Sequence, residues 1–322
     1  MRGFLLRRAL QSIPLLLGVS ALTFLLLRLA PGDFLGTMAD NPAVSAATLD
    51  AMRHRFGLDQ PWYVQYVLYL RGVFLHLDFG ESFSRHQPVF AVLREGLGNT
   101  LLLSGAAALM SWGLAVPLGM WAAARQHSVV DRGLSLAAFT ALSVPEVLSG
   151  LLLLLLAART GWFPVGGMHA SGWDEMRTAE RALDLLRHLA LPALVAGLVP
   201  FAGRMRQVRS SMLDVLRLDH VTAARARGLN ERAILTRHVL RNALNPLITL
   251  FGFTLGMLLS GSLVAEILFS WPGLGRITFE ALMSRDLYLV TGAVLMGAMV
   301  LVAGNLIADV LLAISDPRIG HE

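Results

Sequence analysis

The sequence predicts an all-α integral membrane protein with six transmembrane helices and a large external loop between the first two. Two observations indicate this class. Apolar residues make up 55% of the 322 residues and charged residues only 15%, and the mean hydropathy is +0.60. Soluble domains contain about 25% charged residues. Several apolar stretches also reach the roughly 20 residues that a helix needs to cross the hydrocarbon core of a bilayer.

The composition excludes several kinds of site. The chain has no cysteine, so disulfides, thiolate metal sites and cysteine nucleophiles are ruled out. All 27 basic residues are arginine, whereas the phosphate-binding loop of nucleotide hydrolases needs a lysine after its glycines. Any ATP hydrolysis must therefore come from another chain. The histidines show no close pair at helical spacing, and the methionines in the spans are typical of packing. We therefore predict no bound metal in this chain.

Six stretches are predicted to span the membrane, and they are residues 9–30, 99–121, 133–157, 188–209, 244–269 and 287–314. The first follows arginines at positions 2, 7 and 8, which is also typical of a cleaved secretory signal. Its apolar run is longer than the roughly 7–15 residues of a signal, and no cleavage site of the A-x-A kind follows it. We therefore predict that it is retained as a membrane anchor.

Residues 31–98 are predicted to form an external loop domain, because they are too many for a simple turn between two helices. The spacing of Leu49 and Met52 predicts one helix in this loop, and the stretch from Trp62 to Leu70 predicts a second. The loop is either a folded cap over the outer mouth of a pore or a docking platform for an external partner. The residues alone favour neither interpretation.

The third predicted span contains Ser143, Pro145 and Glu146. A proline in a membrane helix frees a backbone carbonyl and bends the helix, and a carboxylate at that depth has to face protein or a wet cavity. We therefore favour a place for these three residues on a translocation path over a structural ion pair. Asp309, in the sixth span, is expected to have a structural hydrogen-bonding role instead.

A second external loop, residues 158–187, is rich in turn-forming glycines and leads to the fourth predicted span. This span is the least regular of the six, because Pro192 and Pro200 interrupt its apolar run. Proline is tolerated in a membrane helix when neighbouring groups satisfy the freed carbonyls. We therefore expect a span that is short and broken at its prolines.

Residues 219–229 are too polar to cross a bilayer and too regular to be a linker. Asp219 is the predicted N-cap of a short helix, and Gly228 fits the position just after its last turn. Ala223 and Ala224 allow close approach, so the helix suits contact with a groove on another protein rather than burial. The alternative is a basic helix that lies on anionic lipid. Its tether between two spans argues against binding to nucleic acid.

The arginines in the connections predict the orientation of the chain. Fifteen of them share one side, and these are Arg2, Arg7, Arg8, Arg125, Arg132, Arg204, Arg206, Arg209, Arg217, Arg225, Arg227, Arg232, Arg237, Arg241 and Arg318. The opposite side has eleven, of which five lie in the long 31–98 loop, where charges have little influence. The side with fifteen is therefore predicted to be cytoplasmic, and with it both termini.

Motif-like segments occur along the whole chain. Thr222, Ala223, Ala224 and Gly228 occupy the E-A-A and G places of the "EAA" motif in a cytoplasmic loop before the penultimate span. Other such segments are LRRALQSIPLLLGVSALTFLLLRLAPGD, FGLDQPWYVQYVLYL, HLDFGESFSRHQPV, ILFSWPGLGRITFEALMSRDLYLV and NLIADVLLAISDPRI. Together they resemble the first-type ("B") permease subunit of a dipeptide, oligopeptide or nickel importer of the ATP-binding-cassette (ABC) class. Threonine in place of the motif's glutamate is usual in that branch.

The resemblance implies the six-helix fold of type I ABC importer permeases and a set of partners. These would be a homologous second permease subunit in a heterodimer, two ABC ATPase subunits, a periplasmic or lipid-anchored solute-binding protein and membrane lipid, with no nucleic acid. The chain itself would be no enzyme and hold no cofactor, because ATP and magnesium are bound by the ATPases. Closure of the ATPases on ATP would pull the short helix, which would contact them through its docking surface. The residues of this docking surface are Asp219, His220, Val221, Thr222, Ala223, Ala224, Arg225, Ala226, Arg227, Gly228 and Leu229.

The resulting prediction is a multi-pass permease subunit of the bacterial inner membrane that imports peptides. The same subunit in a nickel or metal-chelate importer is the alternative. A stand-alone secondary transporter is less favoured, because it has no use for a docking helix. The predicted parts are residues 1–30 with the first span, the 31–98 loop domain, the core permease domain 99–314 and the cytoplasmic tail 315–322.

Overall fold

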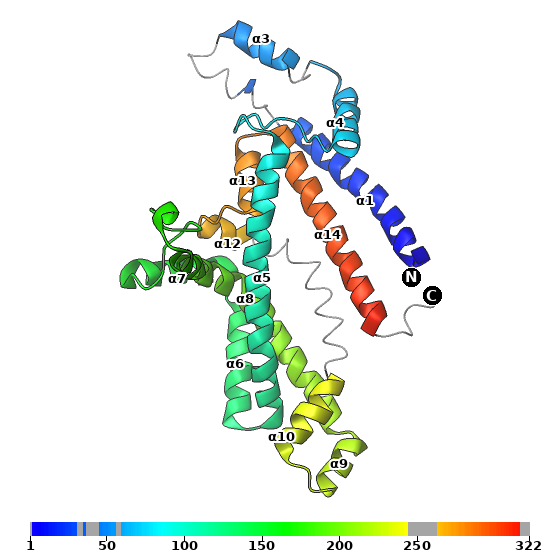
Figure 1. The fold of residues 1–322 in the computed structure, drawn as a ribbon, viewed down its shortest axis with the longest axis vertical. Coiled ribbons are helices and arrows are strands. Elements are labelled where there is room, and N and C mark those ends of the chain that lie inside the picture. Colours follow the sequence, from blue (N-terminus) through cyan, green and yellow to red (C-terminus); the bar gives the residue numbers. More distant parts are fainter. Residues whose placement is uncertain (1, 31–34, 37–44, 56–58, 244–262, 316–322) are drawn as a thin grey trace. The chain divides into compact units, whose positions relative to one another are not determined.

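A computed structural model of the protein describes residues 2–30, 35–36, 45–55, 59–243 and 263–315. Regular structure in these ranges is helical, apart from one isolated bridge between Glu81 and Pro88. Figure 1 labels the α-helices. The elements are α1 (Arg2–Leu29), α3 (Ala46–Arg55), α4 (Trp62–His76), α5 (Val89–Ala124), α6 (Val129–Ser143), α7 (Glu146–Thr160), the 3₁₀ turn η1 (Trp173–Glu175), α8 (Thr178–Leu216), α9 (Asp219–Ala226), α10 (Glu231–Ala233), the π-helix η2 (Ile234–Val239), α12 (Leu263–Leu268), α13 (Leu274–Met283) and α14 (Leu287–Ser315).

Four described helices are long and apolar enough to cross a membrane, namely α1, α5, α8 and α14. The pair α6 and α7 passes the same test as one broken span, which gives up to five. These match five of the six predicted spans. Of the fifth predicted span, 244–269, residues 244–262 lie outside the described residues, so the count of six stays a prediction. The two predicted helices of the first external loop are confirmed as α3 and α4.

The fourth predicted span differs from the expectation. Helix α8 runs for 39 residues without a break, and Pro192 and Pro200 both lie inside it. Its packing explains this result, because Pro192 is buried together with Leu189, Leu191 and Ala193 among neighbouring helices. Each proline removes one backbone hydrogen bond. The burial of Pro192 with the apolar residues around it holds the helix together at that point, whereas Pro200 is only partly buried. The expectation of a short, broken span was therefore wrong.

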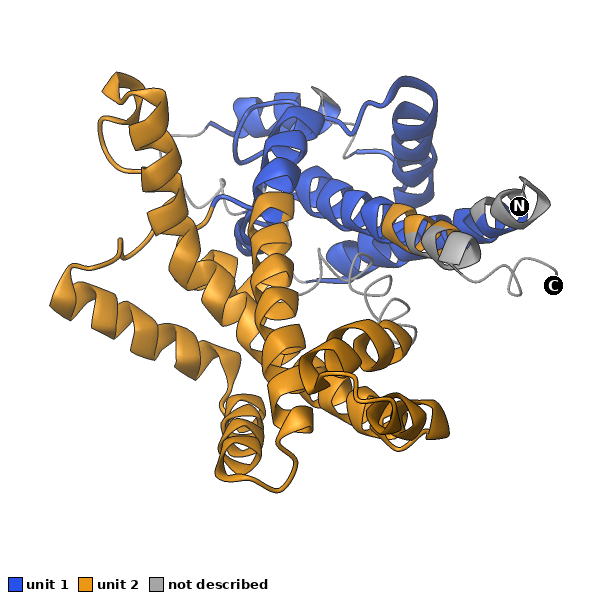
Figure 2. Ribbon diagram, turned by 60° about the horizontal axis from the view of Figure 1, so that its bottom comes forward, with its two compact units in different colours: residues 1–100, 272–302 blue, residues 101–271, 303–322 orange. Residues whose placement is uncertain are grey.

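The chain divides into two compact units, coloured blue and orange in Figure 2. The first unit consists of residues 1–100 and 272–302, and the second of residues 101–271 and 303–322. Segments far apart in the sequence thus contribute to the same unit.

The core of the first unit combines α4, the first turns of α5, α13 and most of α14. Helix α1 packs on α4 through aromatic side chains, with the rings of Phe24 and Tyr66 5.5 Å apart. Tyr69 of α4 stacks on Tyr288 of α14 at 6.0 Å. At Gly292 a Cβ would lie 2.8 Å from a methyl group of Val89, so glycine lets α14 approach α5 closely.

Helix α8 is the central helix of the second unit, because α6, α7 and α12 all pack along it. An apolar cluster of α5, α7, α8 and α12 contains the buried Leu103, Leu189 and Trp271. A second cluster, which we call the α9 cluster, joins α5, α8, α9 and η2, and its residues are Ala123, Val208, Met212, Leu213, Val221, Ala224, Ile234, Val239 and Ala243. The α9 cluster positions residues 219–229, the predicted docking segment.

Candidate functional site

Helix α9 begins one residue earlier than predicted. Its N-cap is Leu218, which has an extended backbone (φ −77°, ψ 146°) and makes no capping hydrogen bond through its side chain. Asp219, the predicted N-cap, is already helical, so that prediction was wrong. Its carboxylate lies in the first turn, where a negative charge is favourable beside the positive end of the helix dipole.

The predicted end of the helix is confirmed. Gly228 has φ +75°, a value that glycine adopts without strain, and it directly follows the C-cap Arg227. The amide of Gly228 donates to the carbonyl of Arg225 at 2.9 Å, and the amide of Leu229 donates to the carbonyl of Ala224 at 3.3 Å. These two bonds form the Schellman motif, which satisfies the last carbonyls of a helix. The chain then turns sharply.

A second turn fixes the segment that follows. The side chain of Asn230 accepts a hydrogen bond of 2.9 Å from the amide of Arg232, so Asn230 is the N-cap of the next helical segment. Arg225 of α9 is bonded to Glu231 across the turn, with 2.7 Å between Nε and Oε1. The π-helix η2 follows and buries Ile234 and Val239 in the α9 cluster. Turns of π-helix are frequent at functional sites.

The two faces of α9 differ in exposure. Val221 and Ala224 are buried in the α9 cluster, so the expectation that they suit contact with another protein rather than burial was wrong. The other residues of the predicted docking surface are exposed, and they are Asp219, His220, Thr222, Ala223, Arg225, Ala226, Arg227, Gly228 and Leu229. Helix α9 is therefore fastened to its own chain by one face and presents a face of small and charged residues on the other.

The predicted translocation-path residues lie at a break in the third span. Ser143 ends α6, and its hydroxyl donates to the carbonyl of Phe139 at 2.9 Å. Pro145 is the N-cap of α7, and Glu146 is its first residue, with a bend of 102° between the two helices. The predicted bend at the proline is confirmed, but Glu146 does not lie in the middle of a continuous helix as expected.

Glu146 is half buried, and its Oε1 atom has no hydrogen-bond partner in the described part of the chain. Ser143 and Pro145 are exposed. An open groove of about 500 Å³ runs beside the break, and its lining residues are Gly133, Leu136, Ala137, Thr140, Ala141, Val144, Ser149 and Leu198. None of the three predicted path residues lines this groove, although Val144 between them does.

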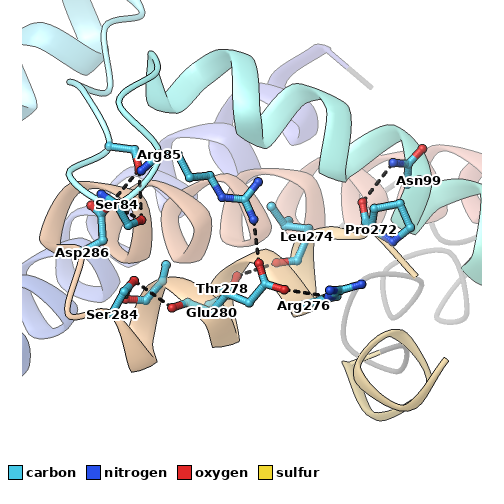
Figure 3. A network of polar contacts seen from close by, with 12 residues as sticks. Ser84, Arg85, Asn99, Pro272, Leu274, Arg276, Thr278, Glu280, Ser284 and Asp286 are labelled. Carbon is cyan, nitrogen blue, oxygen red and sulfur yellow. Dashed lines mark hydrogen bonds and ion pairs between the residues drawn. The ribbon is translucent and has the colours of Figure 1, made fainter. Parts of the chain in front are cut away.

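In the first unit, the end of the external loop is fastened to the start of α14 (Figure 3). Asp286 is fully buried and caps α14 by accepting a hydrogen bond of 3.1 Å from the amide of Leu289. Its other oxygen accepts from the Ser82 hydroxyl at 2.7 Å, and from the amide and the hydroxyl of Ser84 at 2.9 and 3.0 Å. Four hydrogen bonds thus satisfy this buried carboxylate.

Next to this cap, Glu280 of α13 joins two arginines. Its Oε2 accepts from Arg85 at 2.7 Å, and its Oε1 accepts from Arg276 at 2.7 Å (Figure 3). Asn99 of α5 donates to the carbonyl of Pro272 at 2.9 Å, just before α13. This polar network was not predicted from the sequence. Serines and an aspartate in loops two hundred residues apart carry no periodic signal that would pair them.

A further polar contact missed from the sequence joins α6 to α8 in the second unit. Arg209 donates to Asp131 twice, from Nε to Oδ1 at 2.6 Å and from a terminal nitrogen to Oδ2 at 2.8 Å. From the sequence, Arg209 served only to predict the orientation of the chain. Its pairing with Asp131 could not be predicted, because the two residues are 78 positions apart and no local pattern connects them.

Two family models match the chain and together span most of it. Residues 115–321 match the binding-protein-dependent transport system inner membrane component, and residues 1–104 match the N-terminal part of membrane components of such systems.

Two curated relatives match over their whole length. The chain is 39% identical over 323 residues to the oligopeptide transport system permease protein AppB of Bacillus subtilis, with 100% of both chains covered. It is 36% identical over 336 residues to the di/tripeptide transport system permease protein DppB of Pseudomonas aeruginosa, again with 100% of both covered.

Proposed function

Because the chain belongs to the family of inner-membrane components of binding-protein-dependent transport systems, we propose that it is the first-type permease subunit of an ATP-driven peptide importer. The protein is a multi-pass membrane protein with several apolar helices long enough to cross the bilayer. Transport, rather than chemical conversion of a substrate, is its activity.

The exposed face of α9 is the observation that supports coupling to an ATPase. A helix transmits force only if it is held rigidly by its own chain, and Val221 and Ala224 provide that hold in the α9 cluster. The opposite face exposes Thr222, Ala223 and Ala226, whose small side chains let another backbone approach closely. In this proposal the ATPase subunit binds α9 in a groove, and movement of the helix is passed directly to α5 and α8.

The division of labour follows from the residues of the chain. The chain lacks lysine, and with it the lysine of a phosphate-binding loop, so two partner ATPases bind ATP and magnesium and hydrolyse the nucleotide. A homologous second permease and a solute-binding protein complete the importer. The arginine distribution supports a cytoplasmic position of α9 and both termini, on the side of the ATPases.

Peptides are the proposed cargo because the two relatives described above are named as oligopeptide and di/tripeptide permeases. Glu146 supports this choice. Its half-buried carboxylate, at the first residue of α7, has an oxygen without a partner in the described part of the chain. An intramembrane carboxylate in that state is suited to a cationic group such as the amino terminus of a peptide. A cationic nickel complex is the second candidate, because the carboxylate of Glu146 also suits a positively charged metal complex.

Copurification of the ATPase with matched variants of the permease tests the coupling role. Ala223→Glu places a charge and a long side chain on the exposed face of α9, and we expect it to abolish copurification and ATP-driven uptake into proteoliposomes. The matched control is Thr236→Glu, which introduces the same charge at an exposed position of η2. Both variants should insert into the membrane normally. Normal ATPase binding and uptake with Ala223→Glu would show that this face is not the coupling surface.

A further inference from the structure

A polar cavity of about 530 Å³ lies between α6 and α8 in the second unit, apart from the sites described above. Its lining residues are Ser135 and Phe139 of α6 and Gly203, Arg206, Gln207, Arg209 and Ser210 of α8. The two helices pack along each other, and the bonds between Arg209 and Asp131 hold them together at this point. The cavity is therefore a built part of the fold.

The charges of the cavity do not cancel. The charge of Arg209 is balanced by Asp131, whose side chain is only 5% exposed. Arg206 is exposed, and its guanidinium carbon lies 4.4 Å from the centre of the Phe139 ring. No carboxylate is bonded to Arg206 among the described residues. Stacking on the ring thus holds one uncompensated positive charge at the mouth of the cavity.

The remaining polar groups of the cavity suit a phosphate group. Ser135, Ser210 and Gln207 line it together with Arg206, and they carry hydroxyl and amide groups. The amide nitrogen of Gln207 also lies 3.5 Å from the hydroxyl of Ser211. Arginine binds phosphate oxygens with two parallel hydrogen bonds, and hydroxyl and amide donors complete such sites. The cavity volume accommodates a phosphate and the small polar group attached to it.

Apolar side chains continue from the cavity along α6. Leu136, Phe139 and Leu142 recur at intervals of three residues, so they share one face of the helix, and they are 68%, 51% and 37% exposed. A free phosphate ion makes no use of such a face. A molecule with a phosphate head and a hydrocarbon body makes contact with both parts.

The position of the cavity along the span agrees with this chemistry. Helix α8 has 39 residues, and a helix of that length measures about 58 Å, which exceeds the roughly 30 Å of the hydrocarbon core. Arg206 lies in the polar last part of α8, which follows the apolar middle of the helix. Its partner helix α6 is preceded by the arginine-containing connection at 125–128. The cavity thus lies at the level where hydrocarbon gives way to lipid headgroups, on the arginine-rich side.

We propose that this cavity is a binding site for the phosphate of an anionic phospholipid, with Arg206 as the charged ligand and the exposed face of α6 along the acyl chain. Basic pockets between membrane helices on the cytoplasmic side bind such headgroups. The bound lipid fills the cavity between α6 and α8.

The test measures lipid binding to the full chain purified in a neutral detergent. Native mass spectrometry gives the dissociation constants for phosphatidylglycerol and for phosphatidylcholine in the wild type, Arg206→Gln and Arg217→Gln. Arg217 is the matched control, because it is an exposed arginine at the end of α8 outside the cavity. We expect the wild type to prefer phosphatidylglycerol, Arg206→Gln to lose about five- to tenfold in affinity for it, and Arg217→Gln to keep it.

Two further arms separate the possible outcomes. Competition by millimolar inorganic phosphate that displaces the lipid completely would overturn the assignment to a lipid, because the acyl contacts would then contribute nothing.

Ser135→Ala removes one hydrogen-bond donor without changing the charge. We expect it to weaken phosphatidylglycerol binding about two- to threefold, and this variant keeps the test valid if Arg206→Gln folds poorly. Equal losses in Arg206→Gln and Arg217→Gln, or no lipid preference in the wild type, would overturn the proposal.

Discussion

Asp131 of α6 and Arg209 of α8 are joined by two parallel hydrogen bonds of 2.6 and 2.8 Å. The carboxylate also accepts from the amide of His127 at 2.9 Å, so it fixes the connection between α5 and α6 as well. Its side chain is 5% exposed, whereas that of Arg209 is 26% exposed. The pair therefore connects two spans at a point where little water reaches it.

Asp131→Asn is expected to destabilise the protein strongly. The variant leaves the positive charge of Arg209 without its partner in a mostly buried place, and loss of one member of such a pair costs about 3–5 kcal/mol. The control is Glu231→Gln, which breaks the exposed pair with Arg225 and should cost at most about 1 kcal/mol. Thermal unfolding of the purified chain in detergent measures both. Equal melting temperatures for the two variants would show that the Asp131 pair has no special structural role.

Gly119→Ala tests the close contact of α5 with α8. A Cβ at position 119 would lie 2.7 Å from the carbonyl oxygen of Met205 and 2.8 Å from the Cβ of Val208, so the helices must separate. We expect a loss of about 1–3 kcal/mol. Gly113→Ala on the same helix meets nothing within 4 Å and should instead gain about 0.5–1 kcal/mol from the higher helix propensity of alanine. Unfolding curves that shift in the same direction for both variants would contradict the contact.

Val221→Ala tests how α9 is fastened to its chain. Val221 is fully buried in the α9 cluster, and its truncation leaves a cavity that costs about 1–3 kcal/mol. Thr222→Ala, at the exposed neighbouring position, should stay within about 0.5 kcal/mol of the wild type. Hydrogen exchange of the backbone amides in residues 219–243 is the measurement, and it should quicken in Val221→Ala alone. Unchanged protection there would mean that α9 is held by other contacts.

Asp286→Asn is expected to release the end of the external loop from α14. Asparagine has one oxygen and one nitrogen in place of the two carboxylate oxygens. If the nitrogen faces Ser82 and Ser84, three hydrogen bonds lose their acceptor, and if it faces α14, the amide of Leu289 loses its acceptor. The loss is about 2–3 kcal/mol for buried groups left unsatisfied. Limited proteolysis within residues 78–88 should become faster. The control Glu280→Gln alters the partly exposed contact with Arg85 and should leave cleavage unchanged.

Glu146→Gln tests the proposed contact with cationic cargo. The substitution keeps the size and removes the charge of a half-buried group without a structural ion pair, so the fold should be retained. We expect severalfold slower uptake of peptides with a free amino terminus by the reconstituted importer, and little change for peptides whose amino terminus is acetylated. Glu175→Gln, at an exposed carboxylate of the second external loop, is the control. Identical rates for both peptides in Glu146→Gln would remove Glu146 from the path.

The sequence predicted the elements with local signals. Apolar length located the spans, the spacing of Leu49 and Met52 and the stretch from Trp62 to Leu70 located the helices of the first loop, and Gly228 located the end of α9. These features depend on a few neighbouring residues, such as a glycine that accepts a positive φ of +75°. Local errors had local causes. Leu218 instead of Asp219 is the N-cap of α9, because capping depends on the backbone conformation of one residue and not on residue type alone.

Only the tertiary structure decided which faces and charges come together. It buried Val221 and Ala224, left Ala223 exposed, and kept α8 continuous through two prolines, of which Pro192 is buried. It also paired Asp131 with Arg209. The physical reason is that burial and ion pairing depend on residues from distant parts of the chain. The sequence determined by itself that the protein crosses a membrane and carries a short polar helix at residues 219–229, and the tertiary structure decided which face of that helix is buried and which is exposed.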